Sequence, residues 1–238
     1  MPLVRFPTPA GLVYTIDLTK IADRENPRTV EAPIAGEIQT NAVIDWGDGT
    51  SETITSGTFQ THTYAAGAGD VFTIVIRNAT GHLPLIYFSL DNSDTVNTNK
   101  SVTMAVTSID HFFGWSGGSS ARGIPGAFRN TMNMAYIDPR LAGLARWNDL
   151  RLLLRYSAIE QDGESFCFDF ANYNTTFQAS FFNAANLTGK PFVFWNADGT
   201  LDTGRFPNLT TGLQCYTGCS SALRAQVPTA YGGTMTVS

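Results

Sequence analysis

The sequence predicts a mainly β fold, and three observations indicate it. The pair Asp48-Gly49 lies between two runs of alternating β-forming residues, as in a β-hairpin whose turn needs positive φ. Charged residues make up only 15% of the 238-residue chain, well below the ~25% of an average soluble domain. The chain also contains 22 glycines and 16 phenylalanines, which favours loop-rich β structure.

The expected strands occur in regular order through the first 90 residues. They lie at residues 11–18, 41–46, 51–55, 71–77 and 83–89, where β-forming residues alternate between turn signals. The segment 20–37 is polar and broken by proline, so a long loop is expected there. Residues 91–100 are polar apart from Val96 and have the composition of a linker. The sequence therefore predicts two domains, 1–90 and 91–238.

The hairpin region also matches a known pattern. Asp45-Trp46-Gly47-Asp48-Gly49-Thr50 is followed by His62-Thr63-Tyr64, in a corner of the chain. This combination resembles the polycystic kidney disease (PKD) type of immunoglobulin-like domain, which is marked by a D-W-G-D-G turn and a later H-T-Y. The resemblance implies a β-sandwich that acts as a spacer or docking module and not as a catalyst. The residues assigned to its structural turn are Asp45, Trp46, Gly47, Asp48, Gly49, His62 and Tyr64, and Trp46 and Tyr64 are expected to be buried.

Three segments of the second half are similar to one another, which indicates repeats. They are residues 126–134, 180–187 and 214–223. Each has an aromatic residue, then Asn or Gly, then an aliphatic residue. We expect Phe128, Phe182 and Tyr216 to point into one continuous core, with Leu187 and Leu223 beside them.

These segments resemble the irregular leucine-rich-like repeats of the BspA type. Cys219-Ser220-Ser221-Ala222-Leu223 followed by Val227-Pro228 carries the resemblance, and the segment 182–187 matches without the Cys. The resemblance implies a β-rich repeat domain after the sandwich. Residues 138–178 match no clean unit, and 144–155 could form a helix instead.

Charge and cysteine usage exclude several classes of protein. The formal net charge is −5, so no general basic surface for nucleic acid is expected. The start of the sequence has no signal peptide, and no apolar run approaches the ~18 residues of a membrane span. Cys167, Cys215 and Cys219 are too few for a disulfide framework, so buried free thiols are expected.

Candidate catalytic and metal sites were each weighed against a structural role. Residues 114–118 fit the G-x-S-x-G pattern around Ser116, but the glycine-rich sequence after them does not start a helix, so a loop is favoured. No histidine has zinc-ligand spacing, and His62 is expected to make a structural hydrogen bond. Asp45 and Asp48, with Asp17, fit either a calcium site or turn carboxylates, and the turn is favoured. We therefore expect no enzyme, no cofactor and no metal.

The expected function is structural. Modules that resemble extracellular domains occur here without an export signal, as expected for a bacteriophage virion protein, a capsid decoration or tail component made in the host cytoplasm. Its partners would be other virion proteins in many copies, with a host-surface glycan or protein as a further possibility. The candidate interface residues are Arg122, Arg129, Arg146 and Arg151. The alternatives are a bacterial cell-surface adhesin ectodomain and a carbohydrate-binding module of an enzyme.

Overall fold

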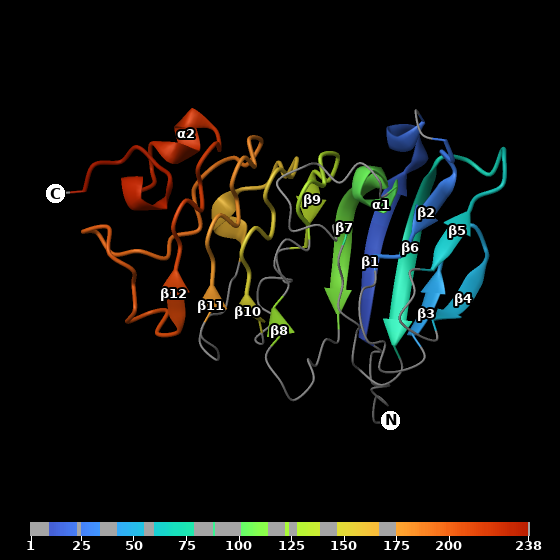
Figure 1. Ribbon diagram of the computed structural model, residues 1–238, viewed down its shortest axis with the longest axis horizontal. Coiled ribbons are helices and arrows are strands. Elements are labelled where there is room, and N and C mark those ends of the chain that lie inside the picture. The colour runs from blue at the N-terminus through green and yellow to red at the C-terminus, as the bar shows by residue number, and fades with distance from the viewer. Residues whose placement is uncertain are drawn as a thin grey trace, which may run out of the picture.

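The computed structural model describes residues 10–22, 25–33, 42–54, 60–78, 88, 101–113, 122–123, 128–138, 147–166 and 175–237. Within these ranges the chain is mainly strand with few, short helices, which confirms the predicted β class. Figure 1 shows an elongated molecule, with the N-terminal strands at one end and the C-terminal turns at the other.

The elements of the described chain follow one another in this order: β1 (Ala10–Asp17), η1 (Leu18–Ile21), β2 (Thr29–Glu31), β3 (Ala42–Asp45), β4 (Ser51–Ile54), β5 (Thr61–Thr63), β6 (Val71–Asn78), α1 (Ser101–Ala105), β7 (Val106–Phe113), β8 (Arg122–Gly123), β9 (Tyr136–Ile137), β10 (Trp147–Asp149), η3 (Gly163–Ser165), β11 (Thr175–Thr176), β12 (Leu209–Thr211), α2 (Ser221–Arg224) and η4 (Thr229–Tyr231). Four of the five strands expected in the first 90 residues are present to within a residue at each end. The fifth, 83–89, lies outside the described residues apart from Phe88, which is buried.

A six-stranded sheet of order β4-β3-β6-β1-β7-β9 forms the N-terminal part. Its two long central strands, β1 and β6, are antiparallel. Alternate side chains of these strands are buried, namely Leu12, Tyr14, Ile16, Phe72, Ile74 and Ile76. Because successive side chains of a strand point to opposite faces, this alternation places one face on the core and leaves the other facing outward.

A second, two-stranded sheet of β2 and β5 covers the core face near β3 and β6. Two expectations need correction here. The segment 20–37 was expected to be a long loop, but it contains β2, and the H-T-Y segment begins as a strand and not as a corner. Val30 of β2 is buried, so this strand is stabilised by its pairing and burial.

The second half of the chain alternates between two parallel ladders. The first ladder is the four-stranded sheet β12-β11-β10-β8, in which every pair is parallel. The second begins with β7 and β9, also parallel. Gln161 continues it, because its side-chain amide donates to the Ile137 carbonyl and accepts from the Ile137 N–H. A parallel bridge between Asp162 and Thr188 extends it further.

The strand β7 belongs to both halves of the molecule. It pairs antiparallel with β1 on one side and parallel with β9 on the other. The six-stranded sheet therefore runs across the predicted division into 1–90 and 91–238, as Figure 1 shows. The residues around the predicted boundary, 91–100, lie outside the described residues. A division into two independent domains stays a prediction, and the shared sheet argues against free movement between them.

Successive turns of the first ladder share one backbone geometry. Residues with positive φ recur four positions apart, at Leu152 and Tyr156, at Ala179 and Asn183, and at Gln214 and Gly218. The residue midway between each pair is fully buried, and these residues are Leu154, Phe181 and Tyr216. Hydrogen bonds connect equivalent positions of neighbouring turns, such as Leu154 N–H to the Ser180 carbonyl at 2.8 Å.

This geometry corrects the predicted repeat alignment. Phe181, and not Phe182, occupies the core position of Phe128 and Tyr216. Phe182 is partly exposed, and its ring lies under the Arg155 guanidinium at 4.6 Å. The segment that matched no unit, 138–178, contributes a full turn around Leu154. The helix considered for 144–155 is not formed, because the described residues 147–155 are strand and turn. That turn was missed because it lacks the aromatic residue and the Asn or Gly that mark the others.

Candidate functional site

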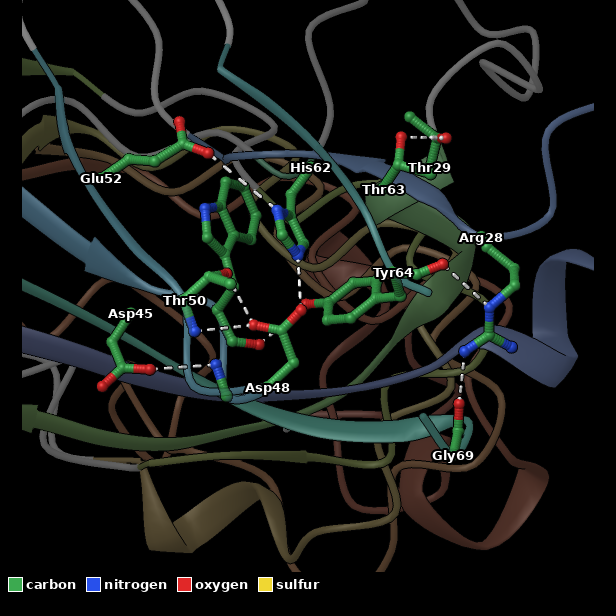
Figure 2. Close-up of polar contacts among 12 residues, drawn as sticks. Arg28, Thr29, Asp45, Asp48, Thr50, Glu52, His62, Thr63, Tyr64 and Gly69 are labelled. Carbon is green, nitrogen blue, oxygen red and sulfur yellow. Dashed lines mark hydrogen bonds and ion pairs between the residues drawn. The ribbon is translucent and has the colours of Figure 1, made fainter. Parts of the chain in front are cut away.

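The D-G hairpin turn is held by its own carboxylates (Figure 2). The Trp46 N–H donates to the Thr50 carbonyl at 3.0 Å and closes a three-residue loop. Asp48 Oδ1 accepts from the Thr50 N–H at 3.0 Å and from its hydroxyl at 2.6 Å. Positive φ occurs at Gly47 and Gly49 and not at Asp48, so the expected two-residue primed turn is wrong in detail. Gly47 is required sterically, because a Cβ there would lie 2.4 Å from the Thr73 carbonyl oxygen.

His62 packs among aromatic rings beside this turn. Its imidazole is stacked on Trp46 with ring centroids 4.8 Å apart, and Tyr64 meets it edge-on at 4.6 Å. Tyr64 in turn stacks on Phe72 at 3.9 Å and donates its hydroxyl to the Trp46 carbonyl at 2.9 Å. Trp46 and Tyr64 are both buried, as the sequence predicts. The cluster therefore connects β5 to β3 and β6 through the core.

Two carboxylates face the His62 ring. Asp48 Oδ2 lies 2.8 Å from Nε2, and Glu52 Oε1 lies 4.0 Å from Nδ1 (Figure 2). Partial burial raises the pKa of Asp48, but hydrogen bonds from Thr50 and His62 outweigh it and lower that pKa to about 2. Burial and the nearby charge of Asp48 raise the pKa of the Tyr64 hydroxyl. Asp48 is thus a charged hydrogen-bond acceptor at neutral pH. One of its carboxylate oxygens stabilises the turn, and the other binds His62.

Arg28 fixes the other end of this cluster. Its Nε donates to the Tyr64 carbonyl at 3.1 Å, and Nη2 donates to the Gly69 carbonyl at 2.6 Å. Nη1 forms an ion pair with Asp70 at 2.8 Å. The sequence prediction did not include Arg28, because an isolated arginine in a polar segment carries no local signal. Its contacts hold the connection between β5 and β6 in place.

A second turn of the same construction lies near the C-terminus, in the sequence Trp195-Asn196-Ala197-Asp198-Gly199-Thr200. The Asn196 N–H donates to the Thr200 carbonyl at 2.8 Å, and Asp198 Oδ1 accepts from the Thr200 N–H at 2.9 Å. Gly199 has φ +80°, close to the +90° of Gly49. Trp195 stacks on Tyr231 at 5.4 Å, much as Trp46 stacks on His62. The shared Asp-Gly-Thr tripeptide, with a tryptophan two or three residues before its Asp, would have been the sequence signal for this turn.

The four candidate interface arginines have different environments. Arg129 is fully buried, so it cannot contribute to a surface, and its place in the predicted interface is wrong. Arg151 is exposed beside the first ladder. Arg122 lies in β8, the edge strand of that ladder, and Arg146 lies outside the described residues. The structure therefore does not bring the four together as one exposed patch.

The remaining sequence candidates lie apart from the turn or outside the described residues. The G-x-S-x-G segment with Ser116 lies outside the described residues. His111 Nδ1 lies 3.6 Å from Oδ2 of the buried Asp138. Cys215 and Cys219 are buried free thiols, and burial raises the pKa of the Cys219 thiol to about 12. A thiol with so high a pKa is a weak nucleophile at neutral pH.

Within the described part of the chain, no group of three or more His, Cys, Asp or Glu side chains could hold a metal ion. No described helix is both long and apolar enough to cross a membrane.

Comparison of the chain with protein-family models found no match. Comparisons with curated proteins and with solved structures found no significant match either.

Proposed function

We propose that this chain is a non-enzymatic structural or accessory protein of a bacteriophage virion, a capsid decoration or tail component that docks onto other virion proteins and displays a surface. In this proposal the N-terminal part is a PKD-like β-sandwich and the C-terminal part is an irregular leucine-rich-like repeat domain.

The observation that carries the proposal is the sharing of β7 by the two halves. A strand paired antiparallel with β1 and parallel with β9 joins the N-terminal sheet to the ladder without a hinge. A rigid body suits a display protein, because a partner held at one end fixes the position of the other end. Repetition of one modest interface over a symmetric particle then supplies avidity.

The polar residues around the D-G turn bind one another, which supports a non-catalytic role. Asp48 and His62 bind each other at 2.8 Å, and each is also held by the turn or by stacking. A general base must reach a substrate proton, whereas the His62 side chain is only 11% exposed. The same cluster supports the PKD-like assignment, since it connects the small sheet of β2 and β5 to the large one.

Docking of the purified chain onto particles tests the proposal. Particles from a phage that lacks the gene are incubated with the full-length protein, sedimented and quantified. We expect saturable binding that Arg151→Glu reduces, because Arg151 is exposed beside the first ladder. The matched control Arg205→Glu changes an exposed arginine elsewhere and should bind like the wild type. Binding to host cells or glycans without binding to particles would instead favour the adhesin or carbohydrate-binding alternative.

A further inference from the structure

The outer face of the six-stranded sheet is an unusual surface. Strands β1, β3 and β6 turn six β-branched side chains away from the core, namely Val13, Thr15, Val43, Thr73, Val75 and Val71. Val71 is 63% exposed and Val43 is 40% exposed. Tyr136 of β9, which is 42% exposed, follows on the same sheet next to Ser108 of β7. Three of the six large hydrophobic residues that are most exposed in the described chain thus belong to this one sheet.

We propose that this outer face is the interface of a homodimer, in which the sheets of two copies pack face to face about a two-fold axis. The occupant is a second copy because Arg77 and Asp17, at opposite ends of the face, complement their own two-fold image. The inference concerns the isolated protein and does not depend on the proposed role in a virion.

Two opposite charges, Arg77 and Asp17, lie at opposite ends of the face. Arg77 of β6 pairs in register with Gly11 of β1 at one end, and Asp17 of β1 pairs with Val71 of β6 at the other. The proposed two-fold axis lies in the plane of the interface and is perpendicular to the strands. Rotation about this axis reverses the strand direction, and each strand then lies over the same strand of the partner. Arg77 of one protomer then faces Val71 and Asp17 of its partner, and the contact is formed twice.

Two further aspartates on this face are already held within the protomer. Asp45 accepts from the Gly47 N–H at 3.0 Å, and Asp110 accepts from the hydroxyls of Thr15 and Ser108, each at 2.6 Å. These internal hydrogen bonds compensate part of the cost of covering the two carboxylates.

The area of the face suits a weak, reversible dimer. Five strands lie side by side in the order β4, β3, β6, β1 and β7, and at ~4.8 Å per spacing they span about 19 Å. An eight-residue strand such as β1 runs for about 26 Å. Because β3 and β4 have only four residues each, the flat outline is about 400 Å². The relief of the side chains raises the accessible area toward the low end of the range that specific interfaces bury per partner. Sheets packed face to face align at about −30°, which small β-branched side chains permit.

Sedimentation velocity of the full chain from micromolar to near-millimolar concentration tests the proposal. We expect a reversible monomer–dimer equilibrium that Val43→Lys weakens by about tenfold or more, because each substitution enters the interface twice. Val193→Lys is the matched control, since Val193 is 42% exposed and lies outside the six-stranded sheet. A monomer at every concentration would overturn the proposal, and equal weakening by both variants would overturn the assignment to this face.

A charge exchange tests the two-fold geometry. Arg77→Asp and Asp17→Arg should each weaken dimerisation, and the double variant should restore it toward the wild-type value. Asp17 also accepts from the Thr19 N–H at the start of η1, so the melting temperature of each variant is measured in parallel. A folded double variant that dimerises no better than the Arg77→Asp variant would contradict the proposed axis.

Discussion

Replacing Phe181 and Phe182 separately by alanine tests the architecture of the C-terminal half. Phe181 is fully buried, and its ring contacts those of Phe166, Phe177 and Tyr216 at 5.4, 5.7 and 5.2 Å. Truncation of such a residue costs ~3–5 kcal/mol through lost burial and the cavity that remains. A typical domain has only ~5–15 kcal/mol in total, so the Phe181→Ala protein should be near the limit of stability.

Phe182 is the matched control because it is the same residue type one position away. It is partly exposed and stacks under the guanidinium of Arg155 at 4.6 Å. Loss of this cation–π contact and of partial burial should cost only ~1 kcal/mol. Urea unfolding followed by tryptophan fluorescence measures both variants. Because the slope is ~1–3 kcal/mol per molar or larger, Phe181→Ala should shift the midpoint by about 1 M or more and Phe182→Ala by a few tenths. A Phe182→Ala variant that is as unstable as Phe181→Ala would refute the alignment drawn from the positive-φ residues.

The remaining predictions concern the turn cluster and Ser116. Gly47→Ala should destabilise the protein by ~2 kcal/mol or more, and Gly49→Ala by only ~1 kcal/mol. Both glycines have positive φ, but only Gly47 faces the Thr73 carbonyl. Equal urea midpoints of the two variants would contradict this. Since the pKa of Asp48 is lowered to about 2, its contribution of up to ~2 kcal/mol is present above pH ~4 and lost as the pH falls toward 2. Asp48→Asn should therefore flatten the acid limb of the stability curve, and an unchanged limb would show that Asp48 is not responsible. Ser116→Ala should leave particle docking intact, and any hydrolase activity that it abolishes would overturn the non-enzymatic proposal.

Local patterns predicted the long strands of the N-terminal part. β1 alternates buried and outward residues from Leu12 to Asp17, and β6 does so from Val71 to Arg77, so the period of two is visible in the sequence. The short strands β2 and β5 were not predicted. Each has three residues, too few for periodicity, and they form because they pair with each other across the chain.

The repeat alignment was wrong by one residue for an identifiable reason. Phe181 and Phe182 are identical in type, so hydrophobicity cannot decide which of them is buried. The deciding residue is Asn183, because its φ of +56° matches Asn130 at +61° and Gly218 at +77°. Asn and Gly tolerate this conformation better than other residues, and an alignment on them would have placed Phe181 in the core.

Two features of the candidate sites depend on tertiary structure alone. Arg129 was assigned to the candidate interface, yet the fold encloses it completely, which is rare for an arginine. The sharing of β7 between β1 and β9 joins strands nearly a hundred residues apart in sequence and has no local signal. The second turn at Asp198 did have a signal, the repeated D-G-T, which the search for longer repeats overlooked.

The amount of this protein in purified particles tests the central claim most directly. Quantitative mass spectrometry of gradient-purified virions, relative to the major capsid or tail protein, gives its copy number. We expect a fixed ratio that is the same between preparations and survives a high-salt wash. A trace amount that varies between preparations, with most of the protein in the host envelope fraction, would contradict it.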